Sequence, residues 1–226
     1  MMILKTAVVI PTLFLSVTLS GCSVTHPKLP VGINTWQQQP ANKISDQGPP
    51  RIQVMVCYGP LTWTHTAIRL VNPTHSTVYW DPGGSYGLEN PRFIRRRDLI
   101  ANPAPTLDQL WAYRMKDCLG NAMEVFEWDL PIHRVRSLQD VLIRGSINPK
   151  AKGTFDPNVI GSDCSKKVCL FLQKYLVGRI DVPKCLLFPH DLGRHLWTQR
   201  PSRVILYRKD RLPTVYIPPP RIGPPS

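Results

Sequence analysis

Cys164 has the sequence context of a catalytic cysteine. It follows Ser162 and Asp163, which are good N-terminal caps for a helix, and an apolar run with helical spacing comes after it. The partial positive charge at a helix N-terminus favours a thiolate over a thiol, and the thiolate is the nucleophilic form. A small buried core cysteine would fit the same pattern, so the assignment depends on a basic partner.

His65 and Asp81 are the residues that could complete such a site. Residues 64–71 and 77–81 are rich in β-forming residues, and the turn residues between them predict an antiparallel hairpin. The hairpin would bring Asp81 beside His65, so that one imidazole nitrogen is held and the other faces the sulfur. We therefore expect Cys164 as the nucleophile, His65 as the base and then the general acid, and Asp81 as the orienting residue.

Two short motifs resemble those of the NlpC-like papain-fold hydrolases. Residues 163–168 (Asp-Cys-Ser-Lys-Lys-Val) are similar to the nucleophile motif Asp-Cys-Ser-Gly-x-Val, with Lys166 at the position of the glycine. Residues 65–70 (His-Thr-Ala-Ile-Arg-Leu) resemble the histidine strand of the same superfamily. The histidine precedes the cysteine, as in the circularly permuted branch that contains YaeF-type bacterial lipoproteins and relatives of lecithin:retinol acyltransferase.

The resemblance implies a thiolate–imidazole pair that attacks an amide or ester carbonyl and acylates Cys164. The strand after His65 would contribute the third polar residue, which places Asp81 in that role. The backbone N–H of Cys164 is the expected oxyanion donor, and Tyr58 is a candidate for a second donor. Cys57 is a less suitable nucleophile, because it lies in an apolar strand without a helix N-terminus to lower its pKa.

The N-terminal residues predict export and a lipid anchor. Lys5 and the apolar residues 6–19 form a signal peptide over residues 1–21, too short for a secure transmembrane helix. The Leu-Ser-Gly-Cys sequence that ends at Cys22 resembles the bacterial lipobox, in which the cysteine is lipidated and becomes the mature N-terminus. Ser23 resembles the pattern of lipoproteins sorted to the outer membrane. We expect an outer-membrane anchor that faces the periplasm.

The remaining chain predicts one domain of the α+β class. Residues 22–50 have the composition of a linker, residues 51–212 form the domain, and the proline-rich residues 213–226 are expected to be an extended or disordered tail. Strands are expected at 51–58, 64–71, 77–81, 123–130 and 202–207, and helices at 106–118, 137–144, 163–177 and 191–197. This order favours a largely antiparallel sheet packed against helices, which the resemblance narrows to a papain-like fold.

Charge and cysteine content limit the partners. The formal net charge is +13, and loss of the signal peptide leaves +12, so anionic membrane headgroups or cell-wall polymers are expected partners. Nucleic acid is not expected for an exported lipoprotein. No cysteine or histidine spacing fits a metal site, and no cofactor is predicted. The pairing of four cysteines in an oxidising compartment is left open: Cys57, Cys118, Cys169 and Cys185.

Two functional hypotheses follow from these residues. The first is a thiol hydrolase or acyltransferase that acts on amide or ester bonds of a cell-wall peptide or a lipid-like substrate. The alternative is a non-catalytic envelope lipoprotein that uses the same fold as a binding or assembly module, with a protein partner that the sequence does not identify.

Overall fold

The computed structural model describes residues 27, 29–59, 64–84, 86, 94–96, 98–101, 103–117, 121–153, 155, 164–183 and 188–220. The predicted signal peptide, the lipidation site Cys22, the helix caps at 162 and 163, and Cys118 and Cys185 lie outside the described residues. Within the described part of the chain, no helix is long and apolar enough to cross a membrane.

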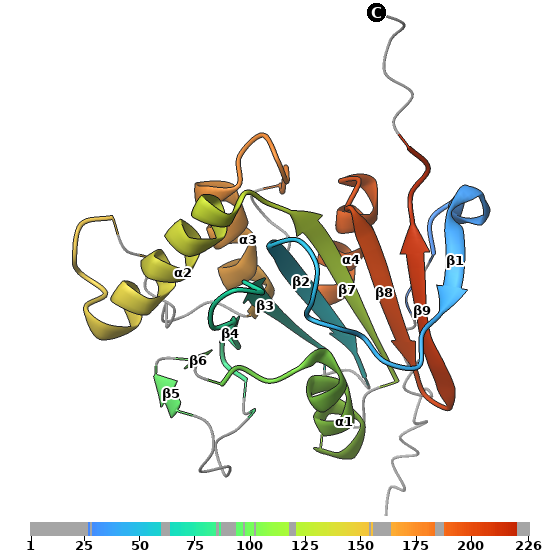
Figure 1. Cartoon of the computed structure of the whole chain (residues 1–226), viewed down its shortest axis with the longest axis horizontal. Coiled ribbons are helices and arrows are strands. Elements are labelled where there is room, and N and C mark those ends of the chain that lie inside the picture. Colours follow the sequence, from blue (N-terminus) through green and yellow to red (C-terminus); the bar gives the residue numbers. More distant parts are fainter. Residues whose placement is uncertain are drawn as a thin grey trace, which may run out of the picture.

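The described residues form one antiparallel sheet and four α-helices (Figure 1). The nine strands are β1 (Gln37–Pro40), β2 (Arg51–Tyr58), β3 (His65–Val71), β4 (Val78–Trp80), β5 (Ile94–Arg96), β6 (Leu99–Ala101), β7 (Ala122–Asp129), β8 (Arg203–Arg208) and β9 (Arg211–Ile217). Their order in the sheet is β1-β9-β8-β7-β2-β3-β4-β6-β5. The helices are α1 (Leu107–Asp117), α2 (Ile132–Ile147), α3 (Cys164–Tyr175) and α4 (Pro189–Thr198), and a short 3₁₀ helix, η1, spans Ile33–Thr35.

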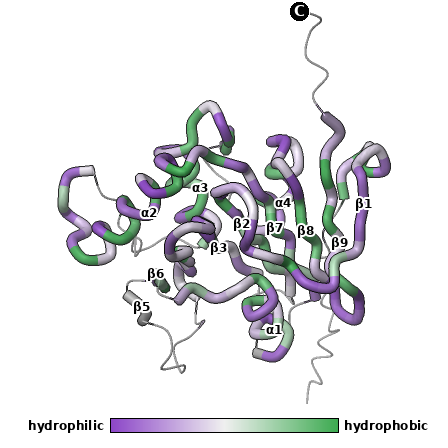
Figure 2. The backbone as a smooth tube through the Cα atoms, viewed as in Figure 1, coloured by the Kyte–Doolittle hydropathy of each residue, from purple (hydrophilic) through white to green (hydrophobic). Residues whose placement is uncertain are grey.

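Helices cover both faces of the sheet, so its central strands are buried on both sides. All eight residues of β2 are buried, and successive side chains of a strand point to opposite faces. Val54 and Val56 pack in the larger apolar cluster with α2, α3 and α4, whereas Met55 packs in the smaller cluster with α1. The helices mix hydrophilic and hydrophobic residues along their length, as expected for helices with one buried face (Figure 2).

The predicted α+β class and most predicted elements are confirmed. The predicted strands at 51–58, 64–71, 77–81, 123–130 and 202–207 correspond to β2, β3, β4, β7 and β8 within one or two residues. At the start of α1, Thr106 and Gln109 form a capping box, in which the Thr106 hydroxyl accepts from the Gln109 N–H at 3.2 Å. Helix α2 begins five residues before its predicted start because Pro131, with φ of −57°, precedes it as the cap.

The predicted domain boundaries were wrong at both ends. The expected tail from residue 213 contributes to β9, in which Val215 and Tyr216 are buried, and the expected linker contributes β1. The proline content of this segment led to the prediction of a tail, because proline is rare inside strands. Pro213, however, lies opposite an irregularity, where the β8–β9 register shifts between Leu206 and Arg208. A bulge tolerates a residue without an N–H, so the strand continues past the proline.

Truncation tests whether the segment after residue 212 is a tail or a strand. Removal of residues 213–226 should lower the free energy of unfolding by about 3–6 kcal/mol, because Val215 and Tyr216 leave the core. Removal of residues 221–226 alone should leave stability unchanged, because β9 ends at Ile217. Equilibrium urea unfolding of the two truncated proteins measures the difference, and equal stabilities would contradict the assignment of β9.

Candidate active site

The β3–β4 hairpin brings His65 and Asp81 into contact, as the sequence predicts. Ile68 pairs with Trp80 in the register, so Asp81, the residue after β4, lies on the same face of the sheet as His65. The His65 Nε2 lies 2.7 Å from Asp81 Oδ1, a distance at which the Nε2–H donates to the carboxylate. Asp81 is fully buried and His65 nearly so, so water does not screen this contact.

Further donors hold the Asp81 carboxylate in place. The Tyr79 hydroxyl donates to Oδ1 at 3.0 Å, the backbone N–H of Tyr86 donates to Oδ2 at 3.2 Å, and Arg114 Nη2 of helix α1 lies 3.4 Å from Oδ1. A Cβ at Gly84 would overlap this carboxylate, so the position requires glycine. Hydrogen bonds to a carboxylate favour its charged form, and donors from several directions hold it in a single orientation.

Cys164 meets His65 from the other side of the sheet. It is the first residue of α3, which packs against β3 and buries Val168, Phe171 and Leu172. The Cys164 side chain lies close enough to the His65 ring for each group to shift the pKa of the other. Because Nε2 faces Asp81, the nitrogen available to the sulfur is Nδ1.

The electrostatics of the pair favour a thiolate and an imidazolium. Burial raises the pKa of Cys164, but the neighbouring His65, and to a smaller extent Thr66, lower it to about 7 overall. Burial and the positive charge of Arg114 lower the pKa of His65, but the neighbouring Asp81 and Cys164 outweigh them and raise it. The two groups titrate as a coupled pair, and a substantial thiolate fraction exists at neutral pH.

The structure does not support Tyr58 as an oxyanion donor. Its hydroxyl donates to buried Glu124, whose other oxygen accepts from Trp197 Nε1 at 2.9 Å. A tyrosine has one proton to donate, and this proton is already committed. The backbone N–H of Cys164 remains the candidate, because the first N–H groups of a helix have no acceptor within it.

The two other described cysteines lie in the core of the protein. Cys57 is buried in β2, directly opposite His65 in the β2–β3 register, and Cys169 is buried in α3. The pairing of the four cysteines stays a prediction, because two of them are not described. Among the described residues, no cluster of three potential ligand side chains could hold a metal ion.

Sequence reasoning missed the residues that support Asp81. Arg114 follows Leu110 by four residues and Leu107 by seven, and α1 buries both of these apolar positions. A charge in the buried stripe of a helix indicates a buried partner, and this signal was available in the sequence. Tyr79 precedes Asp81 by two residues and therefore points to the same face of the sheet.

Comparisons with known proteins identify no relative of this chain. No protein-family model matches it. No curated protein and no solved structure matches it either. The site therefore has to be interpreted from its own geometry.

Alkylation of Cys164 should report the His65 contact. The rate with limiting iodoacetamide, measured on the Cys164 peptide by mass spectrometry, should rise with pH around an apparent pKa of about 7. In His65→Ala, burial of the Cys164 thiol is no longer opposed by a neighbouring cation, so the apparent pKa of Cys164 should rise above about 8.5. An unchanged pH profile would show that His65 does not act on the sulfur.

Asp81→Asn should act on Cys164 through the histidine. Loss of the Asp81 charge leaves Arg114 to lower the pKa of His65, so the imidazolium is less stable and the pKa of Cys164 rises. A rise of one unit lowers the alkylation rate at pH 6 by about tenfold. Asp140→Asn, an exposed substitution on α2, removes the same charge and should leave the rate unchanged.

Proposed function

We propose that this protein is a thiol hydrolase or acyltransferase that acts on amide or ester bonds through an acyl-Cys164 intermediate. We further propose that lipidated Cys22 holds it at the outer membrane, facing the periplasm. The observation that carries the catalytic part is the arrangement of three residues, in which Asp81 binds the His65 ring and His65 lowers the pKa of Cys164.

Each of the three residues, Cys164, His65 and Asp81, has the property that nucleophilic catalysis requires. The nucleophile has a lowered pKa and lies half-buried at a helix N-terminus. The charge of its base, His65, lowers that pKa, and a buried carboxylate fixes the ring of the base. A nucleophile, a base and a third group that orients the base are the recognised signature of covalent catalysis.

The chemistry of the proposed cycle balances without a cofactor. The Cys164 thiolate attacks the carbonyl carbon, and the His65 imidazolium gives its Nδ1 proton to the departing amine or alcohol. Neutral His65 then takes a proton from water, or from an acceptor alcohol or amine, as that group attacks the thioester. The thiolate leaves, and His65 is again protonated. Asp81 stabilises the imidazolium and stays ionised throughout.

Sequence features support the proposed location. The lipobox-like sequence at Cys22 and the signal-like residues before it are typical of exported lipoproteins. A mature charge of +12 would attract the protein to anionic headgroups or cell-wall polymers. Both candidate substrate classes, a cell-wall peptide and a lipid-like acyl compound, occur in that compartment.

A burst experiment tests the catalytic proposal. With a p-nitrophenyl ester, the wild-type protein should release one equivalent of p-nitrophenol rapidly, and the acyl group should be found on the Cys164 peptide by mass spectrometry. Cys164→Ala should lower the rate by about 10³-fold or more, because the nucleophile is lost. Cys57→Ala is the matched control. It removes the thiol of the residue that pairs with His65 across β2 and β3, and it should keep the burst.

The alternative hypothesis makes the opposite prediction. A non-catalytic binding module would give no burst and no acylated peptide. It would instead retain a stable envelope partner when Cys164 is replaced by alanine. That combination of results would overturn the proposed function.

A further inference from the structure

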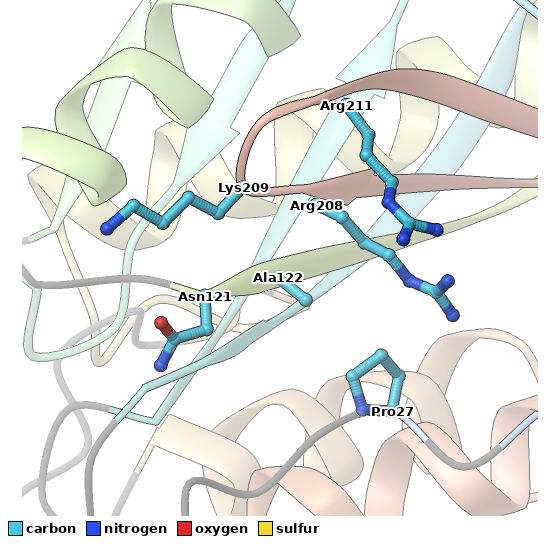
Figure 3. Close-up of a pocket in the computed structure, with 6 residues that line it drawn as sticks. All are labelled: Pro27, Asn121, Ala122, Arg208, Lys209 and Arg211. Atoms are coloured by element: carbon cyan, nitrogen blue, oxygen red, sulfur yellow. The ribbon is translucent and has the colours of Figure 1, made fainter.

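A basic pocket lies at the β8–β9 hairpin, outside the Cys164 site. Its volume is about 460 Å³, and it is lined by Pro27, Asn121, Ala122, Arg208, Lys209 and Arg211. Figure 3 shows that Arg208 and Arg211 extend their guanidinium groups to the same side of the hairpin, whereas Lys209 points the other way.

Backbone pairing forces the two arginines together. Arg208 and Arg211 are direct partners across the turn that closes the hairpin, in which Asp210 has a positive φ of 60°. Like charges directly opposite one another in a sheet destabilise it. Within the described part of the chain, neither arginine lies within ion-pair distance of a carboxylate. The charge of Arg208 acts on Glu124, but the oxygens of that carboxylate are hydrogen-bonded to Tyr58 and Trp197. An anion bound between the guanidinium groups would relieve the repulsion.

The pocket lies at the same end of the sheet as the catalytic histidine. One row of paired residues crosses four strands: His65 of β3, Cys57 of β2, Met123 of β7 and Tyr207 of β8. Arg208 is the next residue after this row. Three strand spacings separate β3 from β8 and four separate β3 from β9, so the backbones of Arg208 and Arg211 lie about 14 Å and about 19 Å from that of His65 across the sheet. Because adjacent residues point to opposite faces, Arg208 lies on the face covered by α3, the helix that carries Cys164.

We infer that Arg208 and Arg211 bind an anionic group, a carboxylate or a phosphate, of the substrate whose carbonyl Cys164 attacks. This inference rests on the proposed function and defines its substrate class. The substrate is an acyl compound that carries a negative charge roughly 14–19 Å from the reacting carbonyl. Paired guanidinium groups suit both anions, because each can offer two parallel N–H donors.

Matched esters test this substrate class. p-Nitrophenyl monoesters of dicarboxylic acids of graded chain length carry a free carboxylate at the far end, and their methyl esters are neutral there. A third series carries a terminal phosphate, which distinguishes the two anions. For the wild-type protein, kcat/KM should favour a charged series over the neutral one by about tenfold or more, at a length that spans the two sites.

Substitution of the arginines should remove this preference. In Arg208→Gln/Arg211→Gln, the ratio of kcat/KM between charged and neutral esters should fall to about one. Arg136→Gln/Arg144→Gln removes two exposed charges from α2 and should keep the ratio, which controls for the loss of net charge. The inference would be overturned if the Arg208/Arg211 substitutions left the ratio of kcat/KM unchanged. It would also be overturned if the Arg136/Arg144 substitutions lowered that ratio equally.

Arginine modification tests the pocket without turnover. Inorganic phosphate or acetate should slow the reaction of phenylglyoxal with Arg208 and Arg211 in the full-length Cys164→Ala protein, but not with Arg136 or Arg144, as mapped by mass spectrometry. Equal reaction at all four would overturn the anion site.

The two proposals fail in different ways. A Cys164-dependent burst with no preference for charged esters would overturn only the inference. Protection of the arginines without any turnover would overturn the proposed function and, with it, the link between the pocket and Cys164.

Discussion

The contact between the Asp81 carboxylate and the His65 ring is the constraint on which the site depends. A fully buried carboxylate is costly unless it is paired, and here Tyr79, Arg114, a backbone N–H and the imidazole share that task. These donors come from both sides of the β3–β4 hairpin and from α1. The ring therefore has one orientation available, in which Nε2 faces the carboxylate and Nδ1 faces the sulfur.

This arrangement explains why the site lies at the end of β3. His65 and Thr66 are the first residues of the strand, and adjacent residues point to opposite faces. Helix α1 approaches from the His65 side with Arg114, whereas α3 approaches from the Thr66 side with Cys164. Only at the end of the strand can groups from the two helical layers reach a single imidazole.

The sequence predicted the three candidate site residues better than the residues that hold them in place. A helix cap, a hairpin and two-residue alternation are local patterns, and they were sufficient to bring Cys164, His65 and Asp81 together. The Arg114 contact joins residues 33 positions apart, and its position depends on how α1 packs, which local patterns do not specify. Tyr58 was misassigned for the same reason, because its partner Glu124 lies on another strand. Strand β9 was missed because proline is a poor strand former except at irregularities such as the one at Pro213.

The pairing of β1 with β9 has a mechanical consequence. Gln37 lies opposite Ile217, so the chain enters and leaves the sheet at neighbouring points of one edge. Tension between the two ends would load the hydrogen bonds of this ladder one after another, as in unzipping, and not all at once in shear. The outer strand would peel away at low force, while the five strands from β8 through β7, β2 and β3 to β4 stay paired around the imidazole.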